Sequence, residues 1–264
     1  MSTSTTNLSK QPITGPALNR ITLESPWKWL AAGWKDLWAN ASLSLMYGAL
    51  FAGVAVLLFF GLMSVDMTAL ILVLAAGFLL LGPMLAVGLY EASWRMETGK
   101  PVTFADMLIV RTKSPVQLAY IGLTLAFMFL AWVRIASLLY AIMWGDQPFP
   151  PIDDFIPTLL NTVRGAVMLA LGTIIGGAIA FAVFAVSVIS VPMLAHRNTD
   201  FMTAIITSIR AVRENFWPMA LWAWLIALLS AFGIAFLFVG LVIVFPLVGH
   251  ATWHAYRDLV TAND

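Results

Sequence analysis

The chain contains no cysteine, which excludes disulfide bonds, thiolate nucleophiles, cysteine-ligated zinc and iron–sulfur clusters. Charged residues are also scarce: they make up 10% of the 264 residues, whereas soluble domains carry about 25%. The formal net charge is only +1, so there is no electrostatic basis for binding nucleic acid, and no nucleic-acid partner is expected.

Sequence motifs of the common enzyme classes are missing as well. The chain has no Ser–His–Asp set, Walker loop, zinc-protease motif or dinucleotide-binding fingerprint. It contains only three histidines, so few side chains are available for metal binding or acid–base chemistry. We therefore expect no catalytic residues and no cofactor.

The first 24 residues are polar and contain neither an apolar stretch nor a cleavage site. They do not resemble a signal peptide, and we predict that residues 1–24 form a disordered cytoplasmic tail. Residues 25–264 suffice for one bundle of membrane helices with short loops, so a single transmembrane domain is expected.

Long apolar stretches dominate the remainder, and hydrophobic residues make up 61% of the chain. A helix needs about 20 apolar residues to cross a bilayer core. On this basis six spans are predicted: residues 43–64, 67–90, 116–144 and 165–195, and two short helices obtained by splitting residues 216–249 near Gly233.

Positive charge is distributed unevenly between these spans. Of the 14 Lys and Arg residues, all except Arg134 and Arg164 lie in alternate gaps or at the ends. The other gaps carry acidic residues: Asp66 in the first, and Asp146, Asp153 and Asp154 in the loop 145–164. Because cytoplasmic loops accumulate Lys and Arg, both termini are predicted to lie in the cytoplasm of a bacterium, with the spans in its inner membrane.

A short sequence repeats along the chain. The tetrapeptide Pro-Met-Leu-Ala begins at Pro83 and again at Pro192, and a looser copy, Pro-Leu-Val-Gly, begins at Pro246. Each proline lies near the cytoplasmic end of the second span of a pair. The repeat indicates three transmembrane hairpins related by duplication, with helices that are kinked where proline removes a backbone donor.

An amphipathic segment precedes each of these hairpins. The first lies at residues 27–39, and one of its faces carries Trp27, Leu30, Trp34, Leu37 and Trp38. The second lies at residues 103–114 and begins with a Thr103–Asp106 capping box. The third lies at residues 201–215, and one of its faces carries Phe201, Ile205, Ile209 and Val212. Such segments lie along membrane surfaces. The predicted fold is therefore all-α: a polytopic membrane protein of six transmembrane helices in three hairpins, each preceded by an interfacial amphipathic helix.

Arg134 is the one strongly basic residue deep within a predicted span. A charge in the membrane costs about 2.5–3.5 kcal/mol or more and so marks a candidate functional residue. Two interpretations follow. Arg134 extends to the outer loop and pairs with Asp146, Asp153 or Asp154, or it contributes to a pathway or substrate site.

The second candidate site is a cluster at the cytoplasmic boundary. When the proline repeats are aligned, His196 corresponds to His250, and Glu91 corresponds to His254. If the repeats pack around a common axis, these four side chains converge. They could then bind a metal, sense pH or hold three helices together, although the neighbouring Trp253 and Arg257 are typical of an interfacial belt.

Small residues recur at Gly172 and Gly176 in the fourth predicted span. This spacing is typical of a close helix-packing surface rather than of a ligand site.

Several blocks together resemble a known family. They are residues 34–38 (Trp-Lys-Asp-Leu-Trp), 82–91, 132–135 and, most specifically, 245–259, which begins Phe-Pro-Leu-Val-Gly-His-Ala-Thr-Trp-His. The family consists of predicted bacterial integral membrane proteins of unknown function, often labelled as cytochrome c oxidase subunits. The resemblance covers about residues 25–260 and implies no catalytic residues. Because this chain lacks the many intramembrane histidines of a haem–copper catalytic subunit, the label leaves only an accessory or assembly-associated role.

Three classes of function remain. A non-catalytic membrane protein, acting as a scaffold, an accessory component or a lipid-interacting protein, needs only spans and interfacial helices. Its expected partners are membrane lipids and a protein partner in a membrane complex. A transporter or channel would use the repeats and helix-breaking prolines. A membrane enzyme would depend on Glu91, His196, His250 and His254.

Overall fold

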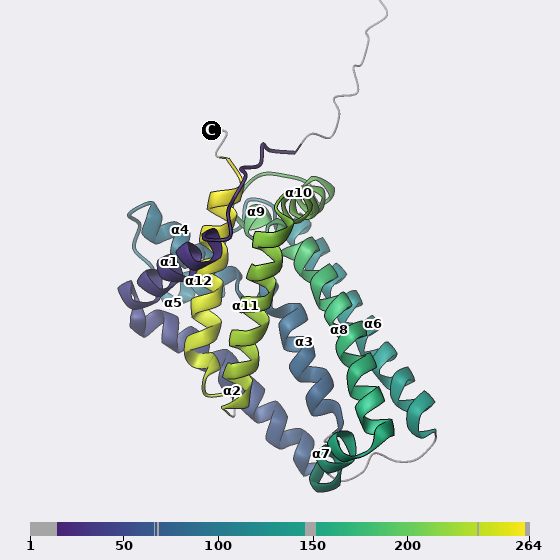
Figure 1. Cartoon of the computed structure of the whole chain (residues 1–264). Helices are drawn as coiled ribbons and strands as arrows, with labels where there is room; N and C mark the ends of the chain where they lie inside the picture. The colour runs from purple at the N-terminus through teal and green to yellow at the C-terminus, as the bar shows by residue number, and fades with distance from the viewer. Residues whose placement is uncertain (1–14, 66, 68, 146–151, 237, 262–264) are drawn as a thin grey trace, which may run out of the picture.

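Five helices are long and apolar enough to cross a membrane among the residues that the structure describes, by length and composition. The structure is a computed structural model that describes residues 15–65, 67, 69–145, 152–236 and 238–261. The long helices are α2 (Ala41–Ser64), α3 (Ala69–Leu85) continued by α4 (Val87–Glu97), α6 (Pro115–Trp144), α8 (Val163–Ser187) continued by α9 (Ser190–His196), and α11 (Phe216–Ala235). They run alongside one another in Figure 1.

Five further helices complete the described part of the fold. They are α1 (Ser25–Ala39), α5 (Phe104–Leu108), α7 (Ile152–Asn161), α10 (Phe201–Glu214) and α12 (Leu241–Leu259). No β-strand occurs in the described part of the chain beyond an isolated bridge between Leu18 and Val260. The all-α class predicted from the sequence is confirmed.

The predicted sixth span corresponds to α12, which is not one of the five candidate spans. Its first half is apolar, but its second half carries His250, His254 and Arg257 and is largely buried within the protein. The final apolar run is nevertheless divided, because α11 ends at Ala235 and α12 begins at Leu241.

The two helices of each predicted hairpin do not pack equally closely. Helices α6 and α8 pack side by side, as do α11 and α12, whereas α2 and α3 touch at few points. The main neighbour of α2 is α12, and the main neighbour of α3 is α6. A Cβ atom at Gly48 would collide with the carbonyl of Val242, so glycine permits the close approach of α2 to α12.

Two of the repeated prolines accompany breaks in long helices. The α3–α4 break falls at Ala86, just after Pro83, and the α8–α9 break precedes Pro192. Neighbouring side chains satisfy the freed backbone groups: the Tyr47 hydroxyl donates to the Leu85 carbonyl at 2.8 Å, and the Ile189 amide donates to the Ser208 hydroxyl at 3.2 Å. Buried polar backbone groups in a membrane protein require such partners.

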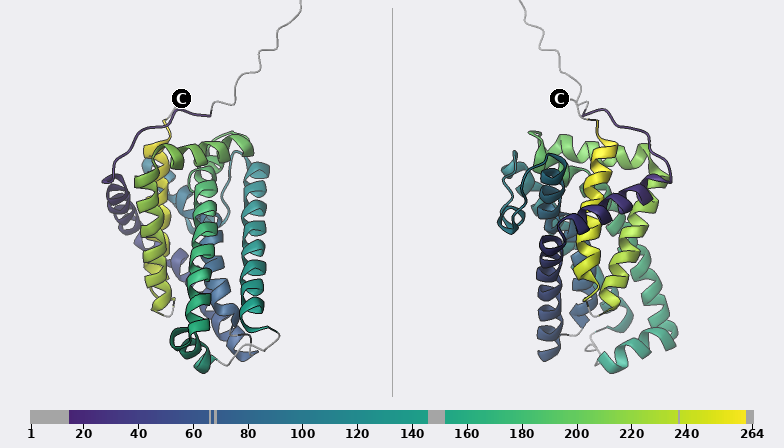
Figure 2. Two further views of the ribbon diagram at one scale, coloured as in Figure 1. Left: turned by 45° about the vertical axis from the view of Figure 1, so that its right-hand side comes forward. Right: turned by 90° about the vertical axis from the view of Figure 1, so that its left-hand side faces the viewer.

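One end of the bundle holds about half of the buried hydrophobic residues of the described chain. We call it the polar end and define it as α1, α4, α5, α9, α10 and residues 249–259 of α12. Figure 2 shows α10 lying across the ends of the long helices and α1 crossing α12. The largest fully buried side chains include Trp253, Tyr90 and Leu194 at this end, whereas apolar side chains such as Leu57 and Phe127 on the long helices are exposed.

Residues 15–24, predicted to belong to a disordered tail, instead form an extended strap on the polar end. The Asn19 amide donates to the Leu259 carbonyl at 2.9 Å, and the Thr261 amide donates to the Ala17 carbonyl at 3.3 Å. The Ile21 amide donates to Asn215 Oδ1 at 3.0 Å. Polar side chains of this strap donate to carbonyls near helix ends, as Asn19 does to Asp258 and Arg20 to Glu214. The strap therefore has no apolar periodicity from which an ordered segment could be predicted. Residues 1–14 lie outside the described residues.

Two other predicted elements differ from the structure. The capping box between Thr103 and Asp106 is present, but the helix that it begins, α5, ends at Leu108 instead of continuing to residue 114. The β-branched pair Ile109–Val110 follows directly and disfavours helix. The predicted outer loop contains α7, whose leucines at 159 and 160 pack near α8. Asp66 and residues 146–151, which include Asp146, lie outside the described residues.

Candidate functional site

Four helices bring one group of polar side chains together at the polar end, which we call the Asp36 network. It consists of Asp36 on α1, Ser44 on α2, Ser93 on α4, and His250 and His254 on α12. His250 is completely buried and lies between two hydroxyls, with Ser44 Oγ 3.0 Å from its Nε2 and Ser93 Oγ 2.7 Å from its Nδ1. Asp36 Oδ2 lies 2.7 Å from Ser93 Oγ and 2.9 Å from His254 Nε2.

The donors in this network can be assigned from Asp36. Its ionised carboxylate can only accept, so the single hydroxyl proton of Ser93 is donated to Asp36. Ser93 Oγ must then accept from the Nδ1–H of His250. With a neutral ring, the Nε2 of His250 accepts from the Ser44 hydroxyl, and the hydrogen bonds run in one direction from Ser44 to Asp36.

The charge of Asp36 is stabilised by its neighbours. Burial raises the pKa of Asp36, but the hydrogen bonds from His254 and Ser93 outweigh burial and hold that pKa below its ordinary value of 3.8. The carboxylate is thus ionised at neutral pH and is the acceptor on which the other members of the network converge.

A second group, the Glu91 network, joins α4 to α9 and α5. Glu91 Oε2 lies 3.2 Å from His196 Nε2, and Arg95 Nε donates to Glu91 Oε1 at 2.6 Å. Arg95 Nη2 also pairs with Asp106 Oδ1 at 3.0 Å. Hydrogen bonds from Thr103 and the charge of Arg95 lower the pKa of Asp106, which lies at the surface. The network connects the ends of the two broken helices.

Trp253 on α12, the helix that carries His250 and His254, packs against the Glu91 network. Its ring packs edge-on against His196 with centroids 4.6 Å apart, and its Nε1 donates to Glu97 Oε2 at 3.1 Å. Glu97 also pairs with Arg257 Nη2 at 2.9 Å. The segments that follow the three repeated prolines therefore pack against one another.

The structure divides the four residues of the predicted cluster into two sets. It brings Glu91 to His196 in one network and places His250 and His254 in the other. Among the described residues, no three His, Asp or Glu side chains form a group that could hold a metal ion. Sequence reasoning missed Asp36, Ser44 and Ser93 as partners, since no local spacing relates residues that are 57 or more positions apart.

The Ser44–His250 pair has the atoms of a nucleophile and its base. Catalysis would also require a substrate to reach the Ser44 hydroxyl. Ser44 is 1% exposed and His250 is 0% exposed, so both are enclosed by packed helices. The pair therefore joins α2 to α12, and packed helices cover the Ser44 hydroxyl.

Arg134 lies exposed on α6, and its side chain makes no ion pair or hydrogen bond with any residue that the structure describes. Of its predicted partners, Asp154 is exposed on α7, and Asp146 is outside the described range. Pairing of Arg134 with the outer segment stays a prediction.

Glycines on α8 form the predicted packing surface with α6. A Cβ atom at Gly176 would lie 2.9 Å from the ring of Trp132, and one at Gly172 would lie 3.7 Å from Leu139. The absence of side chains here allows the Trp132 ring to lie against α8.

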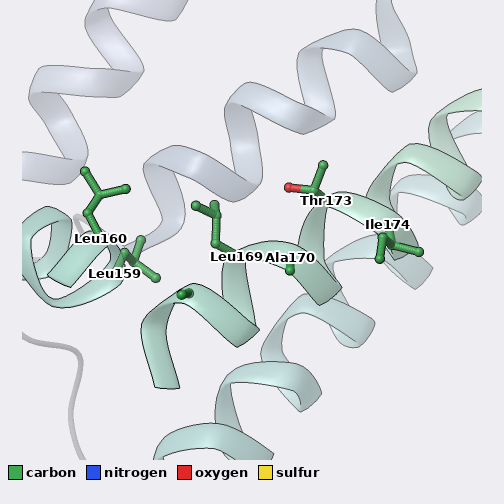
Figure 3. A pocket seen from close by; sticks show the side chains of 7 residues that line it. Leu159, Leu160, Leu169, Ala170, Thr173 and Ile174 are labelled. Carbon is green, nitrogen blue, oxygen red and sulfur yellow. The ribbon is translucent and has the colours of Figure 1, made fainter. Parts of the chain in front are cut away.

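Two apolar hollows lie away from the polar end. One is shallow, at the elbow of α7 and α8, where Leu159, Leu160, Leu169 and Thr173 surround it (Figure 3). The other is a groove between α2 and α3 with a volume of about 280 Å³. Neither is lined by a residue of the Asp36 or Glu91 network.

Comparison with known proteins identifies a family. Residues 70–196 match the sequence profile of a family described as "Predicted integral membrane protein (DUF2189)". The resemblance seen in the sequence is thereby confirmed over this segment, and the chain is an integral membrane protein with several apolar helices. No curated protein and no solved structure gives a match.

Proposed function

We propose that the chain is a non-catalytic, lipid-interacting component of the bacterial inner membrane, with six spans and with its polar end on the cytoplasmic side. The observation that carries this proposal is the contrast between its polar and apolar side chains. The residues that could perform chemistry are paired and largely buried in the Asp36 and Glu91 networks. The exposed side chains of the long helices are largely apolar and aromatic.

Helix α1 supports an interfacial role. Its inner face, with Trp29, Gly33 and Leu37, is buried against the bundle. Its outer face presents Trp27, Trp34 and Trp38, which are 56%, 47% and 50% exposed. The predicted apolar face is thus divided, because Leu37 points inward while the three tryptophans point outward. Tryptophan favours the headgroup region of a bilayer.

Lysine side chains complement these tryptophans. Lys28 and Lys35 are exposed on α1, and each would contribute about 1 kcal/mol near an anionic lipid surface. Helix α10 resembles α1, since Ala204, Ala211 and Val212 are buried while Met202 and Arg213 are exposed. Both helices would then lie along the cytoplasmic leaflet.

A transporter is the second candidate, because the paired breaks in α3–α4 and α8–α9 are typical of such proteins. Hydroxyls within the spans argue against it. Thr124, Ser137 and Ser187 donate to carbonyls of their own helices at 2.7 to 2.9 Å, so they do not line a polar pathway. An accessory role beside a respiratory oxidase would need a protein partner, which co-purification in mild detergent would reveal.

The absence of cysteine permits a direct test with single spin labels in lipid nanodiscs. A label at Trp34→Cys should be more accessible to a lipid-soluble quencher, and one at Lys35→Cys to a water-soluble quencher. Labels at Met202→Cys and Arg210→Cys, which lie about 80° apart around α10, provide the same comparison on that helix. Equal accessibility of both labels on a helix would refute its interfacial placement.

A further inference from the structure

The groove between α2 and α3 is apolar throughout its length. Its lining residues carry no polar side chain: they are Phe51, Val54, Ala55, Leu58, Phe59 and Leu62 on α2, Ile71, Leu74, Ala75, Gly77, Phe78, Leu81 and Leu85 on α3, and Phe129, Ile234 and Phe238 from elsewhere. A ligand that fills it can therefore have no hydrogen-bonding group inside. Apolar cavities of this kind remain dry and accept apolar guests.

The groove is elongated along the helices. It extends along α2 from Phe51 to Leu62, which at 1.5 Å per residue is roughly 16 Å. One leaflet of a bilayer has a hydrocarbon thickness of about 15 Å, half of the 30 Å core. The shape therefore fits one extended hydrocarbon chain better than a compact ring system.

The two ends of the groove differ. Towards the polar end, Phe245 closes it by packing against Phe51 and Phe78, with ring centroids 5.2 and 5.5 Å apart. Towards the other end, Leu62 on α2 and Ile71 on α3 line the groove where the two helices connect. A chain would enter from the leaflet farther from the polar end, with its terminal methyl group near Phe245.

The floor and one wall are formed by aromatic rings from distant parts of the chain. Phe129 on α6 lies against Gly77, where a Cβ atom would overlap its ring. Phe238 packs against Phe59 with centroids 5.8 Å apart. Phe238 also has a φ of 65°, an uncommon conformation for a bulky residue. The fold therefore holds this ring at the groove despite an unfavourable backbone conformation.

We propose that this groove binds one acyl chain of a membrane phospholipid from the leaflet opposite the polar end. Helices α2 and α3 are consecutive yet splayed, and the acyl chain occupies the space that their side chains leave open. The site is separate from α1 and α10, so it does not depend on either helix binding lipid.

The test uses a phospholipid with a photoreactive diazirine at the end of one acyl chain, incorporated into phosphatidylethanolamine–phosphatidylglycerol nanodiscs with the full-length protein. Crosslinks on the wild type should map to the closed end, around Phe51 and Phe78. Filling the groove with Ala55→Leu and Ala75→Leu together should lower this labelling at least fivefold. Unchanged labelling in the double variant would overturn the proposal.

Controls separate the site from folding and from the interfacial helices. Gly61→Leu places a leucine on α2 where a Cβ has no neighbour within 4 Å and should label like the wild type. If the double variant does not fold, each single variant should still lower labelling at least twofold, and no decrease in either would refute the site.

Trp34→Ala should leave groove labelling unchanged, so failure of the interfacial proposal can be distinguished from failure of the groove proposal. Labelling by a diazirine fatty acid but not by the phospholipid would overturn the phospholipid as occupant.

Discussion

At the residue scale, the polar end depends on small hydroxyl side chains that connect charged ones. Ser93 accepts from His250 and donates to Asp36, with both contacts at 2.7 Å. Ser44 supplies the remaining partner of the buried imidazole. Each side chain of the network is a hydrogen-bond partner of another. Removing one side chain therefore leaves a buried polar group without a partner, and this costs more free energy than a single hydrogen bond contributes.

Asp36→Asn should lower the stability of the protein in detergent by about 1–2 kcal/mol at pH 7, because it replaces charge-assisted hydrogen bonds by neutral ones. The pKa of Asp36 is lowered in the folded protein, so its contribution is fully present above the ordinary value of 3.8 and is lost as the pH falls through the folded value. Thermal unfolding should show a constant gap between the wild type and the variant at pH 5–7 that narrows below about pH 4. Glu24→Gln, which removes an exposed carboxylate, serves as the control. A gap that widens on acidification would contradict the assignment.

His250→Ala should destabilise the protein by about 2–5 kcal/mol, because it leaves a cavity and two buried hydroxyls without their partner. His254→Ala should cost less, since the side chain of His254 is 29% exposed and water can replace its contact. Metal analysis of the purified proteins distinguishes packing from ligation. A metal present in the wild type at one equivalent and lost in both variants would show ligation instead of helix pinning.

At the element scale, close helix approaches depend on particular glycines, and helix breaks depend on side chains from neighbouring helices. Pro83 and Pro192 accompany breaks in their helices, yet α12 continues through Pro246. The repeat therefore predicts a place where a helix can break, whereas the neighbours that satisfy the freed groups, such as Tyr47 and Ser208, determine whether it does.

Gly176→Leu should destabilise the contact between α6 and α8 by about 1–3 kcal/mol, because the new side chain would displace the Trp132 ring. Gly177→Leu is a matched control, since a Cβ at Gly177 has no neighbour within 4 Å and both changes raise helix propensity equally. Thermal unfolding of the two variants measures the difference. Equal stabilities would show that α8 does not pack through Gly176.

Gly33→Leu should release α1 from α12, because a Cβ at Gly33 would lie 2.6 Å from the backbone nitrogen of Ala251. Limited proteolysis should then cleave α1 faster than in the wild type. Ala31→Leu, a change at an exposed position of the same helix, should leave the cleavage rate unchanged. Protection of α1 in the Gly33 variant would contradict the proposed docking.

At the scale of the whole molecule, the fold has two zones with different physical requirements. The polar end buries hydrogen-bonded side chains among short helices, whereas the long helices expose apolar surface such as Leu57, which is 74% exposed. Water would make such exposure unfavourable, but a bilayer does not. The described chain ends meet at the polar end, where the strap near Ala17 pairs with Thr261.

Reporter fusions test the proposed orientation. A fluorescent protein joined after Asp264 should fold in the cytoplasm, and alkaline phosphatase inserted after Asp154 should be active outside it. Arg and Lys accumulate on the side proposed to be cytoplasmic, which is the physical reason for this expectation. A dark C-terminal fusion that becomes active when alkaline phosphatase replaces the fluorescent protein would exclude an even number of spans with a cytoplasmic N-terminus.

The sequence by itself determined the membrane class, the places of the long helices and the capping box at Thr103, because each depends on local apolar length or local hydrogen bonding. It also indicated the packing surface at Gly176, since small residues at helical spacing permit close approach. Only the tertiary structure decided that Asp36 joins His254, which lies 218 positions away, and that Glu91 pairs with His196 instead of His254. It likewise decided that residues 15–24 are ordered and that α2 and α3 splay apart. Such outcomes depend on which helices come together, and hydrogen bonds between distant residues leave no periodic pattern along the chain.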